Sequence, residues 1–130
     1  MGENLRDRIL AIDDSHYEDH SVEKWGLTVR LRTITGKQRS MLYQKAQNAN
    51  GELDWPIFQG LLLVSCLCDP KTDKLIFTDK DADKLMNKNA IAVGPLINKA
   101  MELNGLTARN FEEAEKNSVG VIPNEDSISP

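Results

Sequence analysis

The sequence has little of several residue types on which functional assignments usually depend. It contains two histidines and two cysteines in 130 residues, and aromatic residues make up only 5% of the chain. The scarcity of aromatic residues argues against an aromatic-rich β-sandwich. No apolar run reaches 18 residues and no secretory signal opens the sequence, so we expect a cytoplasmic location.

Sequence motifs for catalysis are also missing. There is no Gly-rich phosphate loop, no nucleophile elbow and no Cys/His cluster. With so few histidines, general acid–base catalysis would depend on Asp or Glu, and these residues follow helix starts and polar faces rather than apolar pockets. The sequence therefore predicts a protein that is not an enzyme and that has no cofactor.

The two histidines, His16 and His20, lie four residues apart in a polar segment with four carboxylates between residues 13 and 19. On a helix this spacing would place both imidazoles on one face, as a metal site requires. The motif lacks the glutamate that follows the first histidine in zinc proteases, and no third ligand is recognisable. We expect an exposed linker here and no metal.

Charge is distributed unevenly along the chain. The formal net charge is −5 for residues 1–23, +6 for residues 24–50 and −5 for residues 51–130. The middle segment contains no carboxylate, so it could face nucleic acid or an acidic partner. It could equally be neutralised by the acidic segments of its own chain, which is the interpretation we favour.

The most apolar stretch is DWPIFQGLLLVSCLC, residues 54–68, and it predicts a buried central helix. Asp54 is a good N-cap, Pro56 suits the first turn, and Asp69-Pro70 should stop the helix. Cys66 and Cys68 would point about 200° apart on this helix, which predicts buried free thiols rather than a disulfide. Any face of the helix left uncovered would be a candidate for self-association or partner binding.

Before this helix, the period of the apolar residues changes from helical to that of a strand. Residues 3–12 predict a short helix that must dock on something to persist, because about ten residues are marginal alone. Residues 27–32 alternate apolar and polar residues, which predicts a half-buried strand with Arg30 and Arg32 outward. Residues 20–24 are its expected hairpin partner.

Capping boxes mark two helix starts, one on either side of the central helix. Thr35 and Gln38 predict a helix that runs to about Ala49, and Thr78 with Asp81 predicts another.

The last helices are set by a proline and by turn signals. Because a proline is unfavourable inside a helix, we expect the helix that contains Pro95 to start near Val93 or to break at Gly94-Pro95. It should end at Asn104-Gly105, and a last short helix should follow over residues 108–116.

Together these elements predict a mainly α fold with a small N-terminal β-hairpin (α+β), whose helices pack around the central helix at about 54–68. Residues 1–117 should form one globular domain. The final segment, 118–130, has no apolar period and ends in proline, which predicts a flexible tail.

The order and spacing of these motifs resemble the tail assembly chaperone family of long-tailed (siphovirus-type) phages and prophages. The resemblance runs from Leu5 to Ser118, and residues 75–107 carry most of it. Gly94-Pro95 departs from the family pattern. The stretches that carry the resemblance are LRDRILAIDD, WGLTVRLRTITGKQRS, LLLVSCLCDP, KLIFTDKDADKL and INKAMELNGLT with EEAEKNS after it.

The resemblance implies a non-enzymatic role in viral morphogenesis. Such proteins bind the helical tape measure protein and keep it soluble until the tail tube protein polymerises around it. The family resemblance further implies a homo-oligomer in the host cytoplasm that is absent from the mature virion. It also implies a possible longer frameshifted form that recruits the tail tube protein, with no part for nucleic acid or membrane. A holdase for a helical client needs apolar grooves with polar rims.

An alternative hypothesis is a small nucleic-acid-binding regulator that uses the basic segment, residues 24–50. Under the chaperone hypothesis, we expect the partner-binding side chains to be aromatic or apolar anchors with rim charges. The candidates are Trp25, Arg30, Arg32, Met41, Tyr43 and Trp55.

Overall fold

The computed structural model describes residues 4–106, so the helix expected over residues 108–116 and the tail at 118–130 lie outside the described residues. The elements in chain order are α1 (Leu5–Ala11), β1 (Tyr17–Val22), the 3-10 turn η1 (Glu23–Trp25), β2 (Leu27–Arg32), α2 (Gly36–Lys45), α3 (Trp55–Cys66), β3 (Leu67–Cys68), the 3-10 turn η2 (Asp79–Asp81), α4 (Ala82–Met86) and α5 (Ala90–Leu103).

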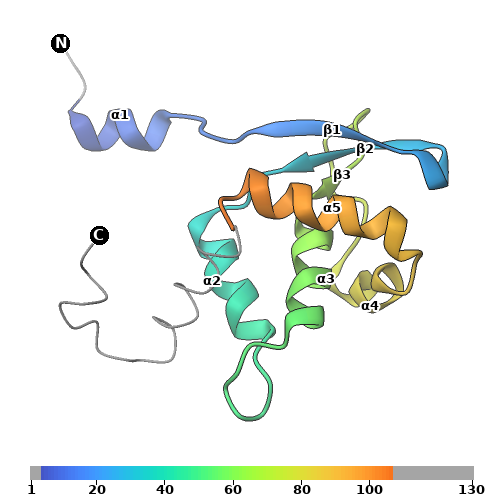
Figure 1. Cartoon of the computed structure of the whole chain (residues 1–130). Coiled ribbons are helices and arrows are strands. Elements are labelled where there is room, and N and C mark those ends of the chain that lie inside the picture. The colour runs from blue at the N-terminus through green and yellow to red at the C-terminus, as the bar shows by residue number, and fades with distance from the viewer. Residues whose placement is uncertain (1–3, 107–130) are drawn as a thin grey trace.

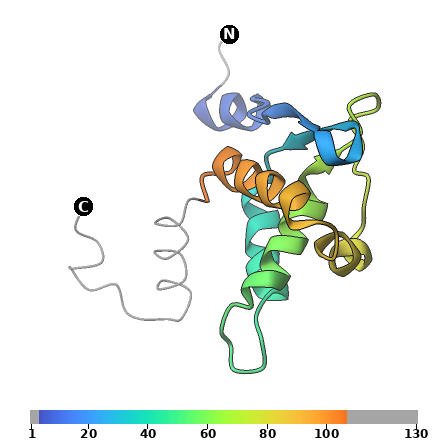
Figure 2. The same ribbon diagram turned by 45° about the vertical axis from the view of Figure 1, so that its right-hand side comes forward.

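The strands form one antiparallel sheet in the order β1-β2-β3. Figure 1 shows this sheet at one end of the molecule, with α5 lying across it and α2 and α3 beyond. Figure 2 shows the same arrangement from a second side. The predicted α+β class with mainly helical content is therefore confirmed.

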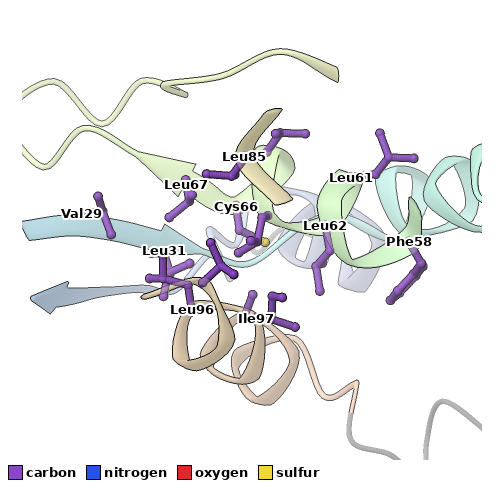
Figure 3. Close-up of a cluster of buried hydrophobic side chains, with 14 of the residues drawn as sticks. Val29, Leu31, Phe58, Leu61, Leu62, Cys66, Leu67, Leu85, Leu96 and Ile97 are labelled. Carbon is purple, nitrogen blue, oxygen red and sulfur yellow. The ribbon is translucent and has the colours of Figure 1, made fainter. Parts of the chain in front are cut away.

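Helix α3 is the central helix that the sequence predicts. The carboxylate of Asp54 accepts a hydrogen bond from the Ile57 N–H at 3.2 Å, and Pro56 sits in the first turn. Seven of its twelve residues are buried, so it contributes to the core on several sides. Figure 3 shows Leu61 pointing to one side of α3, towards Leu85 of α4, while Phe58 and Leu62 point to the side where Leu96 and Ile97 of α5 lie.

The end of α3 corrects the prediction. The helix stops at Cys66 rather than at Asp69-Pro70, and Leu67 and Cys68 form strand β3 against Leu31 and Arg30 of β2. Leu67 and Cys68 are both fully buried there, because pairing with β2 satisfies their backbone groups in the core. Both thiols are buried and free, as predicted, but only Cys66 lies on the helix.

The hairpin is longer on its first strand than the sequence indicates. Strand β1 begins at Tyr17, inside the segment expected to be a linker, and the register pairs Tyr17 with Arg32 and Asp19 with Arg30. These cross-strand partners have opposite or complementary polarity, so a strand forms although the segment is acidic. The predicted strand at residues 27–32 is confirmed as β2.

Two helix boundaries also differ from the prediction. Helix α2 has the predicted capping box but ends at Lys45, because residues 46–54 close a tight loop in which the side chain of Asn48 accepts hydrogen bonds from two backbone N–H groups. Helix α5 begins at Ala90, capped by Asn89, and runs through Pro95. Its buried face, which includes Val93 and Leu96, offsets the missing hydrogen bond.

Helix α1 lies beyond the start of β1, apart from the other helices (Figure 1). It is capped by the side chain of Asn4, which accepts a hydrogen bond from the Asp7 N–H. None of its residues is buried. The predicted helix therefore forms, but the described part of the chain gives it no surface to dock on.

Candidate partner-binding surface

The structure does not gather the six predicted partner-binding residues into one site. Trp25 is half-buried and packs against the edge of the core. The other five residues lie in three separate places. Arg32 and Met41 line one hollow beside α2 and α3, Tyr43 and Trp55 stack on the ring between them, and Arg30 forms an ion pair on the sheet.

Arg30 is used within the fold. Its guanidinium donates to the Asp19 carboxylate of β1 at 2.6 Å and to Asp73 at 2.6 Å. These hydrogen bonds raise the pKa of Arg30, and the same contact lowers the pKa of Asp19. A side chain held by two carboxylates of its own chain has little free charge for a partner.

Other bases of the segment 24–50 are also engaged. The Lys45 ammonium lies 2.6 Å from the Asp79 carboxylate, and Arg32 Nε donates to the backbone oxygen of Ser65 at 3.1 Å. The carboxylate partners of Arg30 and Lys45 favour the interpretation that the acidic segments neutralise part of the basic segment within the chain. They count against a continuous basic surface for nucleic acid.

Tyr43 and Trp55 belong to an aromatic stack. The ring of Phe58 lies 5.5 Å from that of Tyr43 and 5.6 Å from that of Trp55, with interplanar angles of 15° and 11°. The stack ties α2 to the first turn of α3. Burial raises the pKa of the Tyr43 hydroxyl. These residues mainly hold the helices together, although Trp55 keeps an exposed edge.

A groove along one side of α3 is the strongest candidate surface. It consists of two adjoining hollows that share Leu61 and Asp79, and we call it the α2–α3–α4 groove. One hollow, of about 250 Å³, lies between α3 and α4, and its lining includes Ile57 and Met86. The other, of about 310 Å³, lies between α3, α2 and the segment before η2, and Met41 and Arg32 line it.

Apolar side chains form the edges of this groove. Ile57 is 47% exposed, Met41 42% and Leu75 42%, while Leu61 is nearly buried on its floor. The sequence indicates that any uncovered face of the central helix would be a candidate surface, and Ile57 marks such a face. Of the predicted residues, only Arg32 and Met41 line the groove.

The residues that sequence reasoning missed are those whose role depends on how the helices are placed. Asp79 and Asp83 are identifiable from sequence only as first-turn acids of a helix, but both line the groove, where Asp83 lies on the α4 rim and Asp79 pairs with Lys45. Ile57 could have been identified from the sequence, because it belongs to the all-round apolar pattern of α3. Nothing in the sequence points to Met86, because only the close packing of α4 on α3 brings it to the groove.

A third hollow, of about 620 Å³, lies between the end of β1 and the start of α5, and its lining includes His20, Lys24 and Ile91. The histidines are not brought together there. His16 precedes β1 and His20 is within it, and four residues along an extended chain span about 13 Å. Within residues 4–106 there is no group of three His, Cys, Asp or Glu side chains that could hold a metal.

Similarity to known proteins is found by structure and not by sequence. No protein-family model matches the chain, and no curated protein matches it at a significant level. None of the helices within residues 4–106 is long and apolar enough to cross a membrane. The solved structure of the tail assembly chaperone of bacteriophage HK97 is similar to this one, with a TM-score of 0.57 over 76% of this chain and 91% of that chain, at 18% sequence identity. The chain therefore has the fold of a phage tail assembly chaperone.

Proposed function

We propose that this protein is a phage tail assembly chaperone that binds and solubilises the tape measure protein during tail morphogenesis. The observation that supports this most directly is the shared fold with the HK97 tail assembly chaperone over nearly the whole of that chain. The protein acts without catalysis in the host cytoplasm, and it is absent from the mature virion. A longer frameshifted form would recruit the tail tube protein, and a homo-oligomer would present several binding surfaces along one client.

The α2–α3–α4 groove is the client-binding surface in this proposal. An amphipathic helix of the client would place its apolar stripe against Leu61, Ile57 and Met41, and the polar rim would contact its flanks. This role does not require a reactive group. It requires apolar surface that remains accessible in the folded chaperone.

Co-expression with a tape measure protein tests the proposal. The soluble fraction of the client should rise with the wild-type chain and fall again with Met41→Glu or Ile57→Glu, because a charge at either edge opposes apolar docking. Ile91→Glu is the control, since Ile91 is also an exposed apolar side chain, at 68%, but lies outside the groove. A client that is equally insoluble with and without the wild-type chain would contradict the chaperone function.

The nucleic-acid alternative makes a different prediction. DNA or RNA binding through residues 24–50 should weaken steeply with salt. The ion pairs of Arg30 with Asp19 and Asp73, and of Lys45 with Asp79, leave this segment with less free charge than its sequence suggests. We therefore favour the chaperone, whose apolar contacts should tolerate salt.

A further inference from the structure

We propose that α1 of a second copy of this chain docks into the α2–α3–α4 groove. The inference goes beyond client binding, since it assigns a partner for α1 in the absence of any client. It follows from three observations: an amphipathic helix that no other part of residues 4–106 buries, a groove with apolar edges, and opposite charges on the two.

Helix α1 needs a partner to be stable. The large apolar side chains of α1 and of Ile12, which caps its end, are between 57% and 70% exposed, and those of α1 are Leu5, Ile9 and Leu10. A helix of seven residues does not persist alone in water, because too few hydrogen bonds offset the cost of nucleation. Leu5, Ile9 and Ile12 recur at helical spacing, so they form one stripe that can be buried together.

The groove offers a matching surface. Its floor and edges present Leu61, Ile57, Met86 and Met41 along one side of α3, so an apolar stripe can lie against them. Two adjoining hollows provide room for successive apolar side chains, as in other cases where an amphipathic helix lies in a groove.

Charge complementarity sets the direction of the docked helix. We call residues 5–14, which comprise α1 and the segment after it, the arm. The arm is basic in its helical part, where Arg8 flanks the apolar stripe, and acidic after it, at Asp13 and Asp14. Arg6 is already paired with Asp7 at 2.6 Å. The groove carries Asp83 at the α4 end, with Lys80 on the same rim, and Arg32 at the other end, while Asp79 and Lys45 pair with each other at 2.6 Å between them.

The matching orientation therefore places the helical part of the arm, with Arg8, over Asp83 of α4. The segment that follows it, with Asp13 and Asp14, then lies at the Arg32 end of the groove. Either orientation would bury the apolar stripe, but only this one pairs opposite charges at both ends.

The second copy is indicated by how α1 leaves its own body. His16 accepts a hydrogen bond from the Thr33 N–H at 3.0 Å, and its N–H donates to the Thr33 hydroxyl at 3.1 Å, which continues the hairpin beyond Tyr17. The backbone at Ile12 is also extended. The chain therefore projects α1 away from its own helices (Figure 1). Reciprocal exchange between two copies would use the contact twice.

The oligomeric state of the full chain at increasing concentration, measured by sedimentation velocity, tests the proposal. The wild type should associate, and Ile9→Glu should shift the chain to a monomer. Leu27→Glu is the matched control, because Leu27 is similarly exposed but lies on the hairpin. A wild-type chain that stays monomeric at all concentrations would overturn the proposal, as would an Ile9→Glu chain that associates like the wild type.

A charge exchange tests the contact itself. Arg8→Glu or Asp83→Lys alone should weaken association by about three- to tenfold at low salt, because each places like charges together. The double variant should recover most of that loss, since the opposite charges are restored with exchanged positions. If the two effects simply add, the arm does not lie over α4 and the assigned orientation is wrong.

Crosslinking distinguishes the second copy from the chain's own groove. With Ile9→Cys and Ile57→Cys in the same chain, oxidation should yield covalent dimers, and the buried native thiols should not interfere. A crosslink confined to single chains would overturn the assignment to a second copy.

A consequence of the shared groove is that the arm and the client compete, and this step rests on the proposed function. Adding a helical fragment of the tape measure protein should release the assembled chains. If the chains associate through α1 but the fragment neither binds nor releases them, the proposed client fails while the arm docking stands.

Discussion

The side-chain oxygen of Asn104 accepts a hydrogen bond from the backbone N–H of Ile34 at 2.8 Å, across 70 positions of sequence. The amide nitrogen of Asn104 donates to the carbonyl oxygen of Ala100 at 2.9 Å and lies 3.5 Å from the Cys66 sulfur. One side chain thus links the end of α5, the connection between β2 and α2, and the end of α3. The sequence identifies Asn104 only as a helix stop.

Asn104→Ala should lower the free energy of unfolding by about 1–3 kcal/mol, because the partly buried Ile34 N–H loses its acceptor. Asn104→Asp keeps the acceptor but replaces the donors with an oxygen facing the Ala100 carbonyl, so it should not restore stability. Asn98→Ala, on the exposed side of α5, is the control and should change stability little. Urea unfolding measures all three variants, and an Asn104→Ala protein as stable as the wild type would contradict the role of this amide.

Gly60 of α3 packs tightly against Met86 and Ala82 of α4. A Cβ atom built at Gly60 would lie 2.9 Å from Met86 Cγ and 3.3 Å from the carbonyl oxygen of Ala82. Gly60→Val should therefore lower stability by about 1–3 kcal/mol through overpacking, and it should displace Met86 at the groove.

Gly94 provides the comparison, since it also lies in a helix but a Cβ there would meet nothing within 4 Å beyond its own chain neighbours. Gly94→Ala should change the free energy of unfolding by less than about 1 kcal/mol, because the helix preference of alanine is opposed by the restriction that Pro95 places on the residue before it. Thermal unfolding followed by circular dichroism separates the two cases. Equal effects of the two substitutions would show that close approach at Gly60 does not matter.

Much of the fold was predictable because its signals are local. Asp54 at the start of α3 and the capping boxes at Thr35 and Thr78 use residues within one helical turn, and the structure has all three. The end of α3 was not predictable in the same way. Leu67 and Cys68 leave the helix to pair with residues of β2 that lie 36 and 38 positions earlier in the chain, and no neighbouring residue encodes that choice.

From the sequence, the candidate surface could be predicted only in the form that it would lie wherever the central helix is left uncovered. The sequence shows that α3 is apolar on every side, so an uncovered face would be available to a partner. Which face remains uncovered depends on the placement of α2 and α4, and hence on contacts such as those of Gly60 with Met86. Aromatic residues were natural candidates for anchors, but Tyr43 and Trp55 stack on Phe58 and stabilise the helix pair instead.

The ion pair between Glu18 of β1 and Lys99 of α5 should make stability depend on pH. The Lys99 ammonium, 3.0 Å away, lowers the pKa of the Glu18 carboxyl below its usual value of 4.5. The unfolded chain therefore binds the proton more readily, so this contribution is complete above about pH 4.5 and is lost as pH falls through the lower folded value.

Glu18→Gln should accordingly reduce the loss of thermal stability between neutral and acid pH. Glu52→Gln removes a carboxylate from an exposed loop and serves as the control for net charge. The melting temperature across the acid range measures the difference. Parallel curves for wild type and Glu18→Gln would mean that the Lys99 contact contributes nothing to folding.

The thiols of Cys66 and Cys68 should be unreactive until the protein unfolds. Burial raises the pKa of Cys66 to about 12 and also raises that of Cys68, so neither forms the nucleophilic thiolate near neutral pH. A thiol reagent at pH 8 should label the native protein slowly and the unfolded protein at once.

Ser40→Cys, on the exposed side of α2, should react immediately and provides the internal reference. The labelling of the native thiols should accelerate with urea in step with global unfolding, because both cysteines lie where α3 and β3 join the core. Since the folded pKa of Cys66 exceeds its usual value of 9.0, stability should also fall as pH rises above about 9. Rapid labelling without urea would show that this junction opens locally, and α3 would then not be the rigid centre on which the groove depends.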